Sequence, residues 1–162
     1  MFREMRRKKQ ALPQEACSAI LKDGTSGVLA VLGDDGYPYA VPLSYVYDGG
    51  KIYFHCAKSG HKLDAIQKTP KASFCVIAQD LIVPAEYTSY FRSVIVFGTI
   101  RILENPQEKR NAIEKLALKY APDDSTENRQ KTIDKEWAPL CMLEMAIEHM
   151  TGKEAVELAK AR

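Results

Sequence analysis

Residues 54–64, Phe-His-Cys-Ala-Lys-Ser-Gly-His-Lys-Leu-Asp, hold the side chains of this chain that are best suited to chemistry. The stretch contains two of the three histidines, together with two lysines, a serine and a glycine. An alternating apolar run precedes it and a run with helical spacing follows it, so these polar groups lie where a strand passes into a helix. We therefore take this junction as the candidate site.

The helix after the junction is expected to run from Gly60 to about residue 69, with Ser59 as its cap. Free N–H groups and the helix dipole attract anions such as phosphate to a helix N-terminus. Lys62 in the first turn, with His61 and Lys58 at the same end, adds positive charge. The spacing predicts a phosphate-binding helix start, although a solvated basic surface helix has the same pattern.

His55 lies on the strand side of the junction, between the apolar residues Phe54 and Cys56. Beside a redox cofactor, an imidazole can donate a proton or contact a bound ring. A lone strand histidine is equally compatible with a packed or solvated side chain. The nearby strands are rich in aromatic residues, which suit either a sheet core or a platform beside a flat ring: Tyr37, Tyr39, Tyr45, Tyr47, Tyr53 and Phe54.

The sequence lacks the motifs of several other common catalytic and binding sites. The chain has no G-x-G-x-x-G, Walker A or G-x-S-x-G sequence, which argues against Rossmann, P-loop and serine-hydrolase sites. The cysteines and histidines form no zinc spacing and the acidic residues no paired spacing, so we expect no metal site. Cys75 and Cys141 lie in apolar runs and are expected to be buried free thiols.

The 162 residues are 46% apolar and 27% charged, which suits one domain over residues 1–162. No apolar run is long enough to span a bilayer, and no apolar stretch of a signal peptide follows the N-terminal charges, so we expect a cytoplasmic protein without membrane contact.

The charge is concentrated at one end. Residues 1–10 carry five Lys or Arg and one Glu, whereas the rest carries 18 basic and 20 acidic residues. A slightly acidic body with a basic N-terminal tip argues against a nucleic-acid partner. A weaker alternative is nucleic-acid contact through residues 1–9 alone.

Six strands and four helices are expected to position the junction. Pro42 predicts a sheet edge, a bulge or a ligand-facing site, and Gly98 predicts a bulge or bend. Residues 80–91 suggest an irregular link, and residues 151–153 a turn into the charged C-terminal tail 152–162. The expected fold is mainly β, a six-stranded antiparallel barrel with flanking helices, with a β-sandwich as its competitor. The expected strands are 27–32, 37–47, 51–56, 72–78, 93–103 and 140–147, and the helices 13–23, 60–69, 106–120 and 125–136.

Several segments together resemble the pyridoxamine 5'-phosphate oxidase-like FMN-binding split-barrel family, and within it the nitroimidazole-resistance branch. The likeness covers nearly the whole chain. It rests on residues 27–30 (Gly-Val-Leu-Ala), 36–45 (Gly-Tyr-Pro-Tyr-Ala-Val-Pro-Leu-Ser-Tyr), 52–57 (Ile-Tyr-Phe-His-Cys-Ala), 60–64 (Gly-His-Lys-Leu-Asp), 90–94 (Tyr-Phe-Arg-Ser-Val) with Gly98, 108–110 (Glu-Lys-Arg) and 151–153 (Thr-Gly-Lys).

The resemblance implies a split β-barrel that binds FMN, commonly as a homodimer with two flavin sites at the interface. It implies an NAD(P)H-dependent reductase of a small acceptor such as a nitroaromatic, with His55 as the candidate catalytic residue. A flavin- or haem-binding sensor without turnover is the alternative. The implied cofactor-binding residues are Val41, Pro42, Leu43, Ser44, Phe54, His55, Cys56, Ala57, Lys58, His61 and Lys62, with Ser93 approaching across the dimer.

One departure from the family pattern bears on the reaction. Pyridoxamine-phosphate oxidases proper carry an arginine-rich C-terminal substrate motif, whereas residues 152–162 read Gly-Lys-Glu-Ala-Val-Glu-Leu-Ala-Lys-Ala-Arg. Oxidation of vitamin B6 is therefore not expected.

Overall fold

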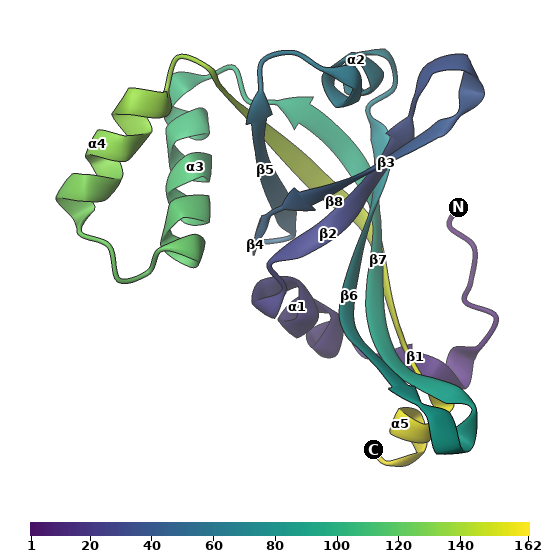
Figure 1. The fold of residues 1–162 in the computed structure, drawn as a ribbon. Helices are drawn as coiled ribbons and strands as arrows, with labels where there is room; N and C mark the ends of the chain where they lie inside the picture. The colour runs from purple at the N-terminus through teal and green to yellow at the C-terminus, as the bar shows by residue number, and fades with distance from the viewer.

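The computed structural model describes residues 1–162 and is built around one antiparallel sheet that curls into a split barrel (Figure 1). The strand order is β3-β2-β6-β7-β8-β5-β4, and β1 pairs with β8. The strands are β1 (Ala11–Leu12), β2 (Ser26–Leu32), β3 (Pro38–Ser44), β4 (Val46–Asp48), β5 (Lys51–Ala57), β6 (Lys71–Val83), β7 (Thr88–Ile102) and β8 (Leu140–Glu154).

Five α-helices flank the sheet. They are α1 (Gln14–Asp23), α2 (His61–Lys68), α3 (Pro106–Tyr120), α4 (Thr126–Glu136) and α5 (Val156–Lys160). In Figure 1, α2 lies at one end of the barrel, and α3 and α4 form a pair at its side next to β5. None of the helices is long and apolar enough to cross a membrane.

The mainly β split barrel is confirmed, but it has eight strands where six were expected. The run 37–47 is two strands because the chain breaks at Tyr45, whose N–H donates to the Tyr120 hydroxyl (3.1 Å) instead of a neighbouring strand. The other addition is the short β1, which pairs Ala11 with Lys153. Pro42 does lie on the sheet edge, in β3, and Gly98 lies at a bulge between β7 and β8.

Residues 80–91 were wrongly expected to be an irregular link. They form the end of a long β6–β7 hairpin, with Asp80 paired to Phe91 and Val83 to Thr88. Pro84 lies in the turn, where it interrupts no ladder, and Tyr87 closes the turn with a φ of 49°.

The C-terminal turn expected at residues 151–153 was also wrong. β8 continues to Glu154, because residues 151–154 pair with β7. The buried Glu154 carboxylate then fixes the strand end through ion pairs with Arg92 (3.0 Å) and Arg162 (2.7 Å).

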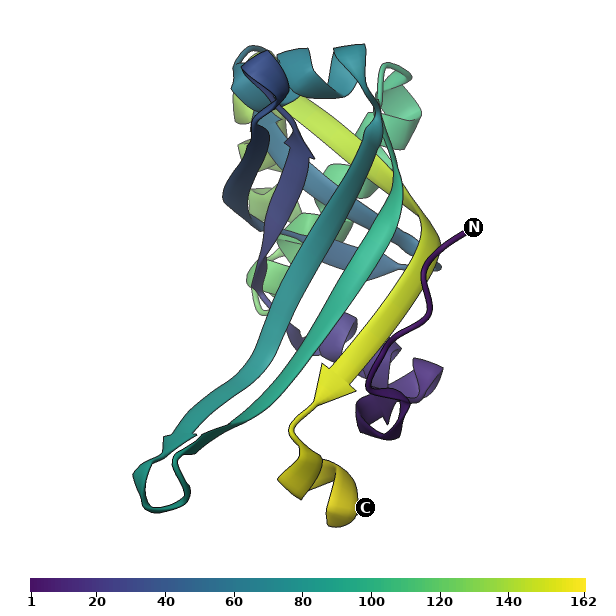
Figure 2. The same ribbon diagram turned by 90° about the vertical axis from the view of Figure 1, so that its right-hand side faces the viewer.

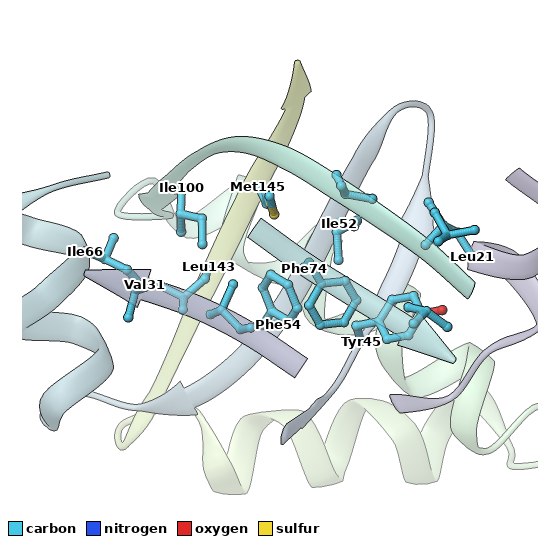
Figure 3. Close-up of a cluster of buried hydrophobic side chains, with 14 of the residues drawn as sticks. Leu21, Val31, Tyr45, Ile52, Phe54, Ile66, Phe74, Ile100, Leu143 and Met145 are labelled. Atoms are coloured by element: carbon cyan, nitrogen blue, oxygen red, sulfur yellow. The ribbon is translucent and has the colours of Figure 1, made fainter. Parts of the chain in front are cut away.

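The barrel interior is filled with packed apolar side chains (Figure 3). Phe54 and Tyr45 both pack edge-on against Phe74, with ring centroids 5.1 and 5.0 Å apart. Leu143 and Met145 of β8 are fully buried beside them. A ligand site must therefore lie outside the barrel or at its ends.

Alternation along β5 sends its side chains in two directions. Ile52 and Phe54 point into the core, whereas Tyr53 packs beside α3 and His55 is exposed. The outward face of β5 thus meets the α3–α4 pair, and this contact creates the candidate site.

Candidate functional site

A cavity of about 590 Å³ lies between the end of β5 and the α3–α4 pair. Most of its wall is apolar, so a ligand with a flat hydrocarbon face would be desolvated there. It is lined by Ser44, His55, Cys56, Ala57, Ile113, Leu116, Ala117, Tyr120, Thr132, Ile133, Glu136, Pro139 and Leu140.

Four of the predicted site residues line this cavity: Ser44, His55, Cys56 and Ala57. They come from the C-terminal ends of β3 and β5, which the fold brings to the same place. His55 is exposed, so its imidazole is accessible to a ligand. The strand half of the 54–64 junction therefore lies at a cavity.

The other predicted residues of β3 and β5 lie differently. Phe54 is fully buried in the barrel core, so its side chain cannot touch a ligand in the cavity, and the expectation for that side chain was wrong. Val41 and Leu43 pack partly against the same core, and Pro42 faces outward from the sheet edge. Alternation along the strands decides these positions.

The helix half of the junction begins at α2, and no side chain caps it. Ser59 was expected to be the cap, but Gly60 occupies that position with a φ of 139°, which places Ser59 one residue too early. The N–H groups of Leu63 and Asp64 bond to the Gly60 carbonyl. The first turn thus offers its earliest N–H groups without any side-chain acceptor of the chain.

The cations around α2 divide into paired and unpaired groups. His61 packs against Tyr39 with tilted rings (centroids 4.1 Å apart), and its Nε2 atom lies 3.8 Å from Asp34. Lys68 in the last turn also contacts Asp34 (3.5 Å). Lys58 and Lys62 form no ion pair. Two uncompensated positive charges therefore flank the uncapped helix start, which is suitable for an anion.

A second cavity of about 390 Å³ adjoins this end, and Lys58 and Lys109 both line it. Burial lowers the pKa of Lys109, and the charge of Lys58 lowers it further. Lys109 Nζ donates to the Trp137 carbonyl (3.2 Å) and lies 4.1 Å from the centre of the Trp137 ring. Lys109 belongs to the 108–110 segment of the family resemblance but was not among the predicted site residues, because it lies on a helix far from the junction along the chain.

Sequence reasoning also missed the opposite wall of the first cavity. Ile113, Leu116 and Tyr120 lie on α3 at helical spacing and line the cavity, but none of them was among the predicted site residues. Arg110 holds α4 against α3 through an ion pair with Asp134 (2.6 Å). Thr132 and Glu136 of α4 then complete the wall, and no local pattern marks either residue.

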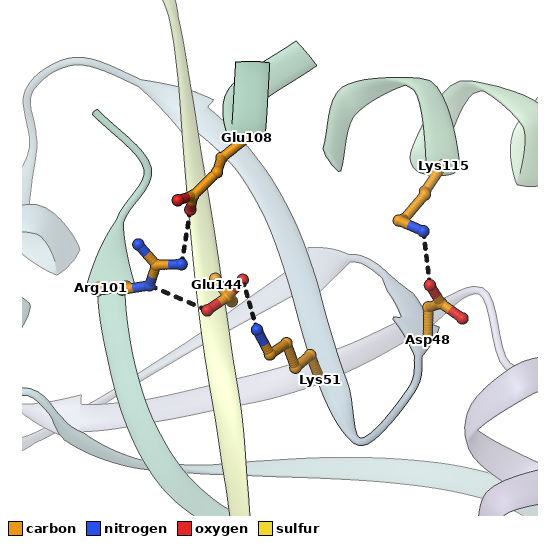
Figure 4. Close-up of polar contacts among 6 residues, drawn as sticks. All are labelled: Asp48, Lys51, Arg101, Glu108, Lys115 and Glu144. Carbon is orange, nitrogen blue, oxygen red and sulfur yellow. Dashed lines mark hydrogen bonds and ion pairs between the residues drawn. The ribbon is translucent and has the colours of Figure 1, made fainter. Parts of the chain in front are cut away.

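A charged network fixes α3 to the sheet (Figure 4). Glu144 of β8 accepts hydrogen bonds from Arg101 (3.0 Å) and Lys51 (3.3 Å), and Arg101 also pairs with Glu108 of α3 (2.6 Å). Lys115 adds a contact to Asp48 (2.6 Å). Burial would raise the pKa of Glu144, but the hydrogen bonds from Arg101 and Lys51 outweigh it and lower that pKa.

Ser93 lies on β7, where it pairs with Ile77 and Lys153 and lines neither cavity within the chain.

No group of three or more His, Cys, Asp or Glu side chains could hold a metal ion. Cys141 is buried as expected, whereas Cys75 is only half-buried, because its side chain lies on the outer face of β6.

Comparison with known families decides the classification. A model of the family described as pyridoxamine 5'-phosphate oxidase matches residues 13–154. The chain belongs to this family. No curated protein matches the chain in sequence.

Solved structures with this fold share little sequence with the chain. A conserved hypothetical protein from Mycobacterium tuberculosis has a TM-score of 0.82 at 17% identity, over 96% of this chain and 92% of that one. A candidate 5-nitroimidazole antibiotic resistance protein from Bacteroides thetaiotaomicron has a TM-score of 0.74 at 18% identity, over 89% and 86%. An FAD- and haem-binding protein from Mycobacterium smegmatis has a TM-score of 0.73 at 22% identity, over 94% and 79%. These likenesses show the split-barrel fold.

Within the pyridoxamine 5'-phosphate oxidase family, the arginine-rich C-terminal motif of the oxidases proper has no counterpart here. Residues 152–154 complete β8, and Arg162 is bound in the ion pair with Glu154. None of the residues that line the first cavity is a lysine or arginine. The first cavity therefore offers no lysine or arginine side chain to a phosphate group.

Proposed function

We propose that this chain is an FMN-binding flavoprotein that acts as an NAD(P)H-dependent reductase of a small acceptor such as a nitroaromatic. The observation that carries the proposal is the uncapped start of α2, with Lys58 and Lys62 unpaired, beside the largely apolar cavity that contains His55. FMN has the matching chemistry, since it joins a flat ring to a single phosphate.

The residues present fit FMN. The free N–H groups of the first turn of α2, together with Lys62 and Lys58, would hold the phosphate, and His61 would line its edge from its position on Tyr39. Ser44, Ala57 and the apolar wall from α3 would contact the ring. Bound FMN would supply hydride and electron transfer.

The chain's own residues would bind and orient the ligands and supply a proton to the acceptor. Ile113 and Leu116 exclude water from one side of the cavity, which strengthens the electrostatic interactions inside it. His55 is exposed to the cavity and can donate a proton to a bound acceptor. No cation lines the cavity, which favours an uncharged acceptor.

The first test is flavin titration of purified protein, with FMN compared with riboflavin, which lacks the phosphate. A charged hydrogen bond contributes roughly 1.5–3 kcal/mol, so Lys62→Ala is expected to weaken FMN binding about 10- to 100-fold and leave riboflavin binding unchanged. Lys68→Ala is the matched control, because Lys68 lies in the last turn of the same helix and pairs with Asp34. Equal FMN and riboflavin affinities would remove the phosphate site from the proposal.

Turnover is tested separately by adding NADH or NADPH to the FMN-loaded protein without oxygen. Loss of the oxidised flavin absorbance and its return on adding a nitroaromatic support a reductase. A flavin spectrum that neither nucleotide changes would favour the alternative, a carrier or sensor without turnover, and a haem spectrum would contradict FMN.

We also propose that the protein is a homodimer. Figure 2 shows β6, β7 and β8 side by side on one face, and Ile77, Ile95 and Phe97 expose apolar side chains there. Ser93 lies two residues before Ile95 and so shares this outer face, which supports its approach to the flavin of a second copy. An apolar face of this kind is typical of an interface.

Sedimentation of the purified protein tests the dimer. Ile95→Lys is expected to give a monomer, because it would bury a charge at the centre of the interface. Leu118→Lys, which places the same charge on an exposed position of α3, should remain dimeric. A wild-type protein that sediments as a monomer at micromolar concentration would overturn this proposal.

A further inference from the structure

Two cysteines face each other at the end of the barrel. The antiparallel register of β5 and β8 places Cys56 directly opposite Cys141. Directly opposed residues of an antiparallel pair have Cα atoms roughly 4.5 or 5.5 Å apart, depending on the type of pair. Both values lie within the roughly 4.4–6.8 Å range of Cα separations that disulfides span.

The two thiols also share one face of the sheet. Cys141 belongs to the main core cluster and Cys56 packs against it, whereas the next opposed pair, His55 and Met142, points to the other face. The Cys56 and Cys141 thiols are neighbours, and Cys141 contributes to the raised pKa of Cys56. Neither is bridged in this structure, in which all four cysteines are free thiols.

The two thiols differ in access. Cys56 is half-buried and lines the large cavity, whereas Cys141 is buried at its side, where it lines the smaller cavity. Burial, together with the neighbouring Cys141, raises the pKa of Cys56 to about 12, and the charge of Lys62 opposes this rise. A small oxidant would therefore reach Cys56 first and react slowly, since only the thiolate attacks.

We propose that Cys56 and Cys141 form a redox-modifiable dithiol that peroxides convert into a cross-strand disulfide. Attack of the Cys56 sulfur on hydrogen peroxide breaks the O–O bond, gives a sulfenic acid and releases water. The Cys141 sulfur then forms the S–S bond to Cys56 and displaces the hydroxyl group as a second water. Two thiols thus give two electrons to one peroxide, and added dithiol reductant reverses the change.

Cys56 lines the proposed flavin cavity, but the disulfide does not require bound flavin, because it needs only the register of β5 and β8 and an external peroxide. A bond there would join the end of β5, which carries His55 and Ala57 into the cavity, to the start of β8. The class of modifying agent is a small, uncharged thiol oxidant that can enter the large cavity.

The experiment treats the folded protein with hydrogen peroxide, then denatures it and alkylates the remaining thiols with iodoacetamide. We expect two alkylated cysteines, Cys17 and Cys75, and the loss of two hydrogen atoms, with four alkylated cysteines again after dithiothreitol. Tryptic digestion should yield a linked pair of peptides spanning residues 52–58 and 136–153.

Two variants test the proposed roles of Cys56 and Cys141. Cys141→Ser should stop at a Cys56 sulfenic acid that dimedone traps, and Cys75→Ser, which removes a half-buried thiol with no opposed cysteine, should form the same disulfide as wild type. Four alkylated cysteines in wild type, under conditions that fully oxidise dithiothreitol, would overturn the proposal. So would a disulfide that includes Cys17 or Cys75.

Discussion

The ion-pair network under α3 makes a sharp prediction, because its central carboxylate is buried and its partners are not. Glu144 is nearly inaccessible to solvent, whereas the side chains of Lys51 and Arg101 are 43% and 54% exposed. Removing one member of a fully buried pair costs about 3–5 kcal/mol, while surface pairs contribute about 0–1 kcal/mol. Since solvent can compensate both cations here, we expect Glu144→Gln to lower the free energy of unfolding by about 1–2 kcal/mol, that is, a Tm lower by about 2–8 °C.

The pH dependence of this loss identifies its cause. The pKa of Glu144 is lowered in the folded protein, so the carboxylate stabilises the fold above its unfolded pKa of about 4.3. That stability is lost as the pH falls through the lower folded value. The difference between wild type and Glu144→Gln should therefore be constant near neutral pH and shrink below about pH 4.3.

Urea denaturation followed by Trp137 fluorescence and by far-UV circular dichroism measures both effects. Trp137 is the single tryptophan and lies at the end of α4 against Lys109, so it reports on the helices that the network fixes. Glu148→Gln is the control, because Glu148 is exposed on the same strand and forms no ion pair. If Glu144→Gln matched that control at pH 7, or if its deficit persisted unchanged in acid, the network would not stabilise α3 as argued.

Two other substitutions separate the roles of neighbouring residues. Gly60→Ala should lower the free energy of unfolding by about 1–3 kcal/mol and weaken FMN binding, because the φ of 139° at this position strains any residue with a Cβ. Ser59→Ala is the control, and it should change neither the free energy of unfolding in urea nor the FMN affinity in a flavin titration. Phe54→Ala should lower the free energy of unfolding by about 3–5 kcal/mol in urea denaturation, while the adjacent exposed His55→Ala should leave stability unchanged. A Phe54→Ala protein of wild-type stability would contradict the core position of that ring.

Local signals in the sequence predicted local structure well. Asn105 followed by a proline and a glutamate is the pattern of a capped helix start, and its side chain accepts the N–H groups of Gln107 and Glu108. The Asp-Gly pair at residues 35–36, a typical turn sequence, turns the chain between β2 and β3, with both residues at positive φ. Such features depend on a few consecutive residues, whereas the turn expected at residues 151–153 was overridden by the pairing of this segment with β7.

Features that depend on distant segments could not be predicted in the same way. Residues 80–91 form a hairpin because each half pairs with the other, and no local pattern shows that pairing. Pro84 lies in the turn between the two halves. The α3–α4 wall of the cavity and the position of Lys109 beside Lys58 follow from how the helices pack on the sheet. The register that opposes Cys56 and Cys141 is likewise a property of two strands far apart in the chain.

The alternation of β5 explains why stability and function can coexist within one short strand. Phe54 fills the barrel and holds the sheet together, while its neighbour His55 faces the cavity and adds little to the core. Cys56 points inward again, at the barrel end where the core meets the cavity, so it is buried enough to keep a high pKa and open enough for a small oxidant. Directly after the strand, Gly60 starts α2 without a cap and leaves its first N–H groups for a ligand. A one-residue slip of β5 against β8 would exchange the inward and outward sets, and it would remove the His55 site, the Cys56–Cys141 pair and the Phe54 core contact together.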